Sequence, residues 1–180
     1  MAKWVIDSDH AVGEFTVYHM MVTPVHGQFN AVRGSVDFDP ADPGNLSVEV
    51  DIETAGLYTG VARRDTHLKS PDFFDAANFP VMTFKSTAVE VVALNNLIIR
   101  GDLTIRGITC PVTFRAHFLG PSKFHDDELK QTYTTFGFRA KTSIDREQFG
   151  MQWNVGIEEK GFMVGKTIDV VFNAEIDLEM

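Results

Sequence analysis

Apolar and polar residues alternate with a period of two along most of the chain. The clearest runs are residues 46–52, 97–105, 112–118 and 168–178, in which every second residue is mostly Leu, Ile, Val, Phe or Ala. Alternation with one apolar face is typical of half-buried antiparallel strands. We therefore expect an all-β protein whose strands share one core.

The alternation changes phase at two places. Phe29 is inward at an odd position, whereas Val32 and Phe38 fall on even ones, with Gly34 beside the change. A second change follows Met82 and Phe84, since the next apolar residues are Val89 and Val91. A slip of one residue reverses the faces of a strand, so we expect a β-bulge or sharp bend at each place.

Residues 59–80 do not follow the strand pattern. Ala62–Lys69 could form two helical turns, and Ser70-Pro71-Asp72 resembles a second helix start with Pro at its first position. About eight antiparallel strands with a short helical insertion near residues 60–79 predict a barrel or a sandwich. The 15 phenylalanines, most of them inward, favour a barrel with room for one ligand.

Composition narrows the class of protein. A length of 180 residues with 44% apolar residues predicts a single domain over residues 1–180. The net charge of −9 argues against nucleic acid and against anionic lipid head groups as partners. The single cysteine, Cys110, excludes an internal disulfide and a cysteine-based zinc site.

Neither a secretory signal nor a membrane span is evident. The first residues lack the apolar run of a signal, and no segment approaches the roughly 18 apolar residues of a span. We therefore expect no integral membrane segment and a cytoplasmic location, or a periplasmic one if the chain has been trimmed.

Catalytic motifs are missing, so we expect no enzyme and no cofactor or metal. Gly161–Thr167 ends in Gly-Lys-Thr like a phosphate-binding loop, but the glycines are too close and an alternating strand follows, so a hairpin turn is expected. The histidines are scattered without ligand spacing. His10 and His19 could face one another across the barrel mouth, although structural roles are favoured.

Two polar clusters remain as candidates. Arg63–His67 precedes Leu68 and the pair Phe73-Phe74, and is either a helix start held to the barrel or a polar lid over a ligand head group. Asp145-Arg146, followed by residues 149–151 (Phe-Gly-Met), is expected to form a strand-end salt bridge and an aromatic plug.

Long runs of the chain, in order, resemble the YceI-like family. The matching runs are Trp4–His10, Thr59–Ser70, Asp72–Asp75, Phe79-Pro80, Phe84–Thr87, Gly101–Thr109, Pro111-Val112, Ile144–Arg146 and Phe149–Met151. The resemblance implies a lipocalin-like antiparallel barrel, often dimeric, that binds a polyisoprenoid such as a quinone or polyprenyl lipid along its interior.

Strand phase then selects candidate ligand-binding residues for this lipid-binding domain. The wall candidates are Phe15, Val17, Phe38, Val48, Val50, Phe84, Leu103, Ile105, Phe136 and Phe138. The lid candidates are Arg64, His67, Phe73 and Phe74.

Three alternatives stay open at this point. One is an enzyme that uses His10, His67 and Asp145 around the mouth. Another is a filled barrel that acts as a protein-interaction module. The third is a fatty-acid or amphiphile binder anchored by Arg33 or Arg139, although strand phase directs Arg139 outward.

Overall fold

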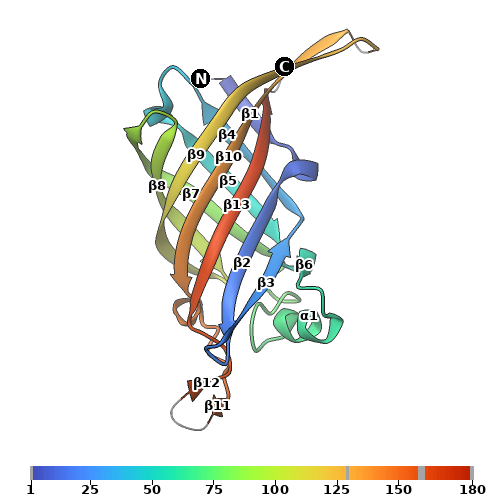
Figure 1. The fold of residues 1–180 in the computed structure, drawn as a ribbon, viewed down its shortest axis with the longest axis vertical. Coiled ribbons are helices and arrows are strands. Elements are labelled where there is room, and N and C mark those ends of the chain that lie inside the picture. Colours follow the sequence, from blue (N-terminus) through green and yellow to red (C-terminus); the bar gives the residue numbers. More distant parts are fainter. Residues whose placement is uncertain (1, 129, 158–160, 179–180) are drawn as a thin grey trace.

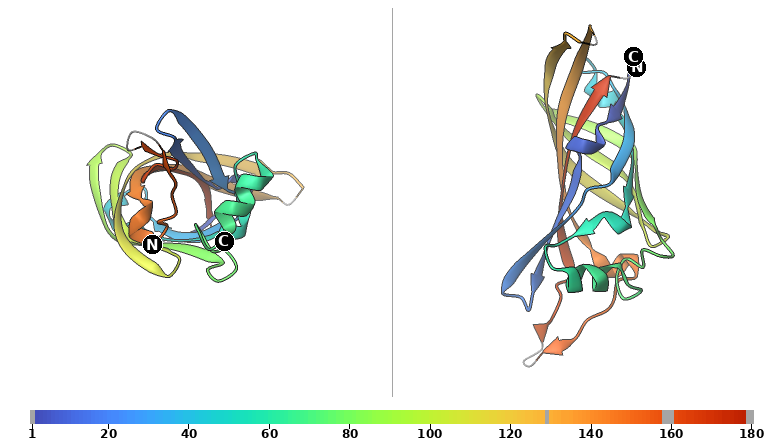
Figure 2. Two further views of the ribbon diagram at one scale, coloured as in Figure 1. Left: turned by 90° about the horizontal axis from the view of Figure 1, so that it is seen from below. Right: turned by 90° about the vertical axis from the view of Figure 1, so that its right-hand side faces the viewer.

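The computed structural model describes residues 2–128, 130–157 and 161–178, which form a closed antiparallel β-barrel. The strands follow the order β1-β4-β5-β7-β8-β9-β10-β13, and β1 pairs with β13 to close the ring (Figure 1; Figure 2, left). The eight-stranded barrel predicted from the alternation is confirmed. Its strands are β1 (Ala2–Ile6), β4 (Val32–Phe38), β5 (Ser47–Glu53), β7 (Val81–Ala93), β8 (Asn96–Ile105), β9 (Ile108–Asp126), β10 (Gln131–Asp145) and β13 (Thr167–Leu178).

At three neighbouring positions in the barrel, two short strands separated by a break lie end to end in place of one long strand. β2 (Val12–His19) continues the path of β1, β3 (Thr23–Phe29) that of β4, and β6 (Leu57–Tyr58) that of β5. The breaks are η1 (Ser8–His10), residues 30–31 and η3 (Thr54–Gly56). β13 therefore pairs with β1 near one end and with β2 near the other.

These breaks explain the first phase change. The expected bulge beside Gly34 is wrong, because β4 keeps an unbroken register with β1 and β5. The phase changes before Val32, as the sequence indicates, because β3 ends at Phe29 and β4 begins at Val32. Residue 34 is a glycine for a different reason, because a Cβ there would overlap the Glu49 carbonyl. The second change is confirmed as a register shift between Ser86 and Ala88.

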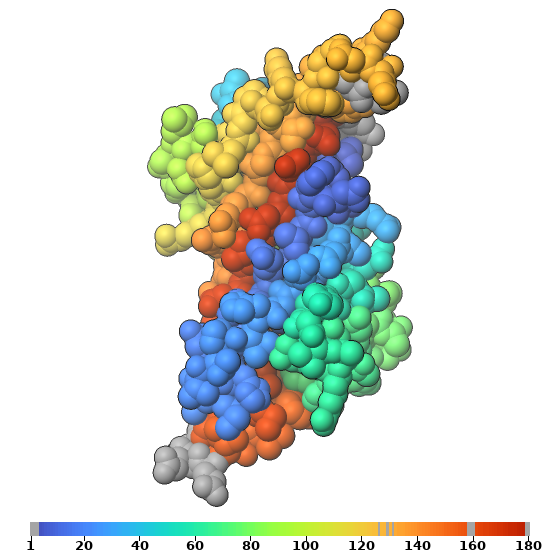
Figure 3. Space-filling model, turned by 45° about the vertical axis from the view of Figure 1, so that its right-hand side comes forward, coloured from blue at the N-terminus to red at the C-terminus, as the bar shows by residue number. Residues whose placement is uncertain are grey.

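The insertion between β6 and β7 contains one helix, α1 (Ala62–Lys69), as predicted. The second helix start is wrong, because residues 71–78 form turns. The amides of Phe74 and Asp75 donate back to the carbonyls of Leu68 and Ser70, and Asp75 has a positive φ of 49° that no helix allows. Figure 3 shows the insertion (teal and green) packed against β2 and β3 (blue).

One end of the barrel carries α1, η4 (Arg146–Phe149), the β2–β3 turn and the short hairpin of β11 (Gly156–Ile157) and β12 (Gly161–Phe162); we call it the lid end (Figure 1, bottom). Residues 163–166 bend from β12 into β13. The phosphate-loop resemblance is therefore accidental, because a strand follows where that motif needs a helix. The remaining short element, η2 (Pro43–Asn45), joins β4 to β5.

The opposite end, near both termini, is closed by four buried aromatic residues that we call the aromatic plug: Trp4, Phe38, Phe118 and Phe136. Their rings meet edge to face, with centroids 5.1 Å apart for Phe38 and Phe136 and 5.3 Å apart for Trp4 and Phe136. Such pairs add to the stabilisation from burial alone. The indole of Trp4 donates to the Phe38 carbonyl at 2.9 Å, so the plug buries no unpaired N–H.

Among the described residues, no helix combines the length and the apolar character that crossing a bilayer would require.

Candidate ligand-binding cavity

The barrel encloses a cavity of about 190 Å³ between the aromatic plug and the lid end. Ordinary cores contain few voids larger than a water molecule, so this is a preformed site and not a packing defect. Its exposed surface is apolar. Inward side chains of most barrel strands form the wall, and Leu68, Phe73 and Phe74 of the insertion complete it.

Ten of the fourteen predicted binding residues line this cavity. They are Phe15, Val17, Val48, Val50, Phe73, Phe74, Phe84, Leu103, Ile105 and Phe138. Phe38 and Phe136 point inward as predicted but lie in the aromatic plug, outside the cavity lining. Strand phase shows which face a residue occupies and not its height along the barrel.

Arg64 and His67 do not reach the cavity. The Arg64 guanidinium donates to the Thr59 hydroxyl and carbonyl, both at 2.8 Å, and Asp65 accepts from the Thr59 amide at 2.9 Å. His67 pairs with Asp72 at 2.9 Å. The contacts of Arg64 and Asp65 with Thr59 hold α1 against the end of β6, whereas the His67–Asp72 pair lies within the insertion. The helix-anchoring interpretation of this cluster is therefore the one the geometry supports.

The lid itself is aromatic. Phe73 is buried against the cavity, and its ring also contacts His67 and Trp153, with centroid distances of 5.1 and 5.4 Å. Phe74 packs edge to face on Phe29 at 5.2 Å. The insertion therefore covers this side of the cavity with the rings of Phe73 and Phe74.

Arg146 is a buried charged residue with a different role from the salt bridge expected for it. No carboxylate of the described chain lies within ion-pair distance, so the expected strand-end salt bridge is wrong. The guanidinium instead donates to the carbonyls of Gly165 (2.9 Å), Val164 (3.3 Å) and Met151. Burial lowers the pKa of Arg146 below its ordinary value.

Arg146 thereby fastens the loop after η4 to the start of β13. Its guanidinium lies 5.9 Å from the centre of the Phe73 ring, and so it also supports the lid. The aromatic group that the sequence predicts after Arg146 is buried, since Phe149 is fully buried and Met151 lines the cavity. The alternation of β10 could have placed Arg146 inward, because Thr142 and Ile144, which precede it at every second position, also line the cavity.

Several wall residues were missed, although the alternation included them. β13 contributes Ile168, Val170 and Phe172, and β9 contributes Phe114. Phe114 packs edge to face on Phe84 with 5.2 Å between centroids. The alternation showed that these side chains face inward, but it did not show the order of the strands around the barrel or which inward residues border the cavity.

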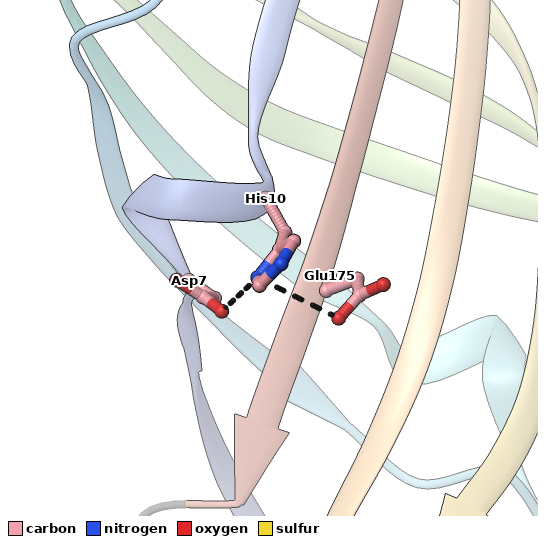
Figure 4. Close-up of side chains that lie close together, drawn as sticks. All are labelled: Asp7, His10 and Glu175. Atoms are coloured by element: carbon pink, nitrogen blue, oxygen red, sulfur yellow. Dashed lines mark hydrogen bonds and ion pairs between the residues drawn. The ribbon is translucent and has the colours of Figure 1, made fainter.

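A polar cluster of metal-ligand type lies outside the barrel, at the break between β1 and β2 (Figure 4). His10 Nδ1 lies 2.6 Å from Asp7 Oδ2 and 3.9 Å from Glu175 Oε2. The hydrogen bond with Asp7 raises the pKa of His10 and lowers that of Asp7. These side chains could hold a divalent cation, but their ion pairs already account for their proximity.

His10 and His19 do not face one another. His19 ends β2, where its backbone pairs with Val164, and the eight residues of β2 separate it from η1. At about 3.3 Å per residue that separation is about 26 Å. The expected meeting across the mouth is therefore wrong.

Comparison with known proteins identifies the family. Residues 4–176 match the model of the YceI-like domain. A UPF0312 protein of Pseudomonas savastanoi pv. phaseolicola is 38% identical over 153 residues, which cover 84% of this chain and 77% of the relative. A UPF0312 protein of Pseudomonas fluorescens Pf-5 is 35% identical over 162 residues, covering 86% and 79%.

Solved structures share the fold. BcnA of Burkholderia cenocepacia superposes with a TM-score of 0.78 at 24% identity, covering 94% of this chain and 98% of that one. The YceI protein of Campylobacter jejuni gives 0.73 at 25%, covering 91% and 90%. A polyisoprenoid binding domain from Saccharophagus degradans gives 0.69 at 11%, covering 99% and 100%. With the family model matched across the barrel, its lid and η4, the chain belongs to the YceI-like family.

Proposed function

We propose that the protein is a non-catalytic carrier or store that holds a polyisoprenoid chain, such as an isoprenoid quinone or polyprenyl lipid, in the cavity. The observation that carries the proposal is the apolar cavity surface, bounded by the aromatic plug at one end and by the phenylalanines of the insertion at the other. Such a space accepts an apolar tail and leaves a polar head group at the lid end.

The energetics are sufficient for binding. Burying several hundred Å² of a chain contributes on the order of 10 kcal/mol at about 25 cal/mol per Å². The loss of translational freedom and the ordering of the tail cost several kcal/mol of this binding free energy. The remainder corresponds to a dissociation constant of about micromolar or lower. One methylene changes binding by only about 1–3 kcal/mol, so selectivity rests on chain length and on groups at the lid end.

One structure of the same fold is named as a polyisoprenoid binding domain, but at 11% identity the likeness concerns the fold alone. The proposal for this chain rests on its family membership and its own cavity.

The alternatives fit less well. A filled barrel would leave no cavity. The proposed fatty-acid anchors face outward, since Arg33 pairs with Glu53 at 2.8 Å and Arg139 is exposed. An enzyme would need its catalytic groups together. His67 instead pairs with Asp72, and Asp145 accepts from the Glu147 amide at 2.9 Å.

The first experiment is organic extraction of the purified native protein followed by mass spectrometry. A polyprenyl species near one per chain is expected. A fatty acid would keep the barrel site and change the ligand class. An empty extract, with no thermal shift on adding quinone analogues, would reject the carrier function.

Variants of the wall test where the ligand lies. Phe84→Asp places a charge on the cavity wall, and Ala140→Phe fills the cavity with an apolar ring. Both should lose co-purifying lipid. Ala140→Phe matters most, because it removes cavity volume without placing a charge in the barrel. Circular dichroism checks folding, and Ala88→Phe on an exposed position of β7 is the control.

We also propose the homodimer that the family resemblance implies. Light scattering coupled to gel filtration should give twice the chain mass, and a monomer at micromolar concentration would reject it. The expected cytoplasmic location stays a prediction for fractionation of the source cells.

A further inference from the structure

The lid end carries exposed apolar side chains on two neighbouring segments, which we call the apolar tip: Tyr18, Met20, Met21, Val22, Val155 and Phe162. Exposure reaches 57% for Met21 and 76% for Val22. The segments are joined, because the Met20 amide donates to the Met163 carbonyl at 2.9 Å and the Met163 amide to the Val155 carbonyl at 3.0 Å. Figure 1 shows the β2–β3 turn and the β11–β12 hairpin at the bottom of the barrel.

The β2–β3 turn breaks a local rule. Met20 and Met21 have φ values of 51° and 62°, in the left-handed region that favours Gly, Asn and Asp. At the β7–β8 turn Asn95 adopts this conformation, with φ of 61°, and at the β8–β9 turn Arg106, with φ of 53°, is followed by Gly107. Two consecutive methionines in the β2–β3 turn cost backbone energy and expose apolar surface, and neither effect stabilises the fold. Departures of this kind concentrate at functional positions.

The apolar tip adjoins the cavity. Val17, which immediately precedes Tyr18, lines the cavity, and so does Val164, which follows Met163. Their strands are fastened by the His19–Val164 bridge and by the Gly165 amide, which donates to the Tyr18 carbonyl at 2.9 Å. Residues of the apolar tip therefore lie one or two positions along the chain from residues that line the cavity.

We propose that the apolar tip docks the protein on a lipid bilayer, so that a chain can pass between membrane and cavity without crossing water. This inference rests on the proposed carrier function. A bilayer is the occupant favoured by the geometry, because the tip is made of turns, which can enter a fluid interface, and because it adjoins the cavity that would hold a membrane lipid. Methionine suits this role, since its flexible side chain adapts to irregular apolar surroundings.

Charge specifies the kind of bilayer. The chain carries a net charge of −9. Attraction to anionic head groups is therefore absent, and docking depends on apolar insertion. Zwitterionic phosphatidylcholine vesicles should bind the protein at least as well as vesicles containing phosphatidylglycerol, and added salt should not weaken binding to the zwitterionic ones.

The test is flotation of the full chain with phosphatidylcholine vesicles. The double variant Met20→Asn/Met21→Gly removes the apolar side chains and relieves the turn, so it should be at least as stable as the wild type. It should nevertheless bind vesicles at least about fivefold more weakly. The matched control is Leu94→Ser, which removes an 87% exposed apolar side chain from the β7–β8 turn and should bind like the wild type.

Three results would overturn docking: a wild type that does not float with vesicles, a double variant that floats equally well, or a dimer that the double variant abolishes, since the tip would then bind a second copy. The carrier function fails separately. A protein that floats but yields no lipid on extraction loses the carrier function alone, whereas one that carries lipid but does not float loses only the docking.

Discussion

The ring of Phe15 lies directly against Gly27, its partner across the β2–β3 pair, so closely that a Cβ at residue 27 would overlap the ring. Phe15 lines the cavity and also a groove on the outside of β2, β3 and β6. The barrel wall is therefore one side chain thick at this point. An aromatic residue opposite a glycine in this way covers backbone that the glycine leaves bare.

Gly27→Ala should displace the Phe15 ring from the cavity wall. We expect the free energy of unfolding to fall by about 1–3 kcal/mol, as for other overpacked sites, and the affinity for a polyprenyl chain to fall with it. Denaturant titration and ligand titration measure the two effects. Gly137→Ala is the control, because nothing lies within 4 Å of a Cβ there. Equal stabilities for the two variants would contradict the role of Gly27.

Arg146→Met should destabilise the lid end. It leaves the carbonyls of Met151, Val164 and Gly165 without their donor, and a lost hydrogen bond to a charged group costs about 1.5–3 kcal/mol. The exposed substitution Arg139→Met should change little. Hydrogen exchange should show lost protection in residues 150–157 and 161–166, with β7 and β8 unaffected. Uniform loss across the barrel would count against a local role.

The cluster of Asp7, His10 and Glu175 should make stability depend on pH. The pKa of His10 is raised above 6.5, so its contribution is complete below pH 6.5 and is lost as the pH rises through the raised pKa. The pKa of Asp7 is lowered below 3.8, so its contribution is present above that value and is lost as the pH falls through the lowered pKa.

The melting temperature of the wild type should therefore exceed that of His10→Asn at about pH 5.5, and the difference should vanish at about pH 9. High salt should reduce the difference, because the cluster is exposed. His26→Asn serves as the control, since the described partner of that ring is the Thr16 hydroxyl. A difference that does not depend on pH would show that the ion pairs contribute nothing measurable.

Trp153 should report ligand entry by fluorescence. It contacts Phe73, which lines the cavity, whereas the other tryptophan, Trp4, is buried in the aromatic plug. Titration with a polyprenyl chain should shift the emission of the wild type and of Trp4→Phe, and Trp153→Phe should lose the shift. A signal that follows Trp4 instead would mean that the chain penetrates the plug.

Much of the architecture could be predicted, because the alternation of apolar and polar residues within each strand shows which face of that strand is buried. Val48, Val50 and Phe84 were placed on the cavity wall from alternation alone, and Ala62–Lys69 was recognised as the helix from the loss of that alternation. The bulge near residues 86–88 was also visible, since a local register shift leaves a local mark in the sequence.

Alternation determined the all-β class, the inward residues and the insertion, because burial on one face of a strand is a local property. Only the tertiary structure decided which inward phenylalanines fill the barrel and which leave it hollow. Phe38 and Phe84 have the same pattern around them, yet Phe38 belongs to the plug and Phe84 to the cavity wall. The difference depends on strand stagger and on rings from distant strands meeting at one height. The burial of Arg146 among carbonyls from two other segments arises in the same way.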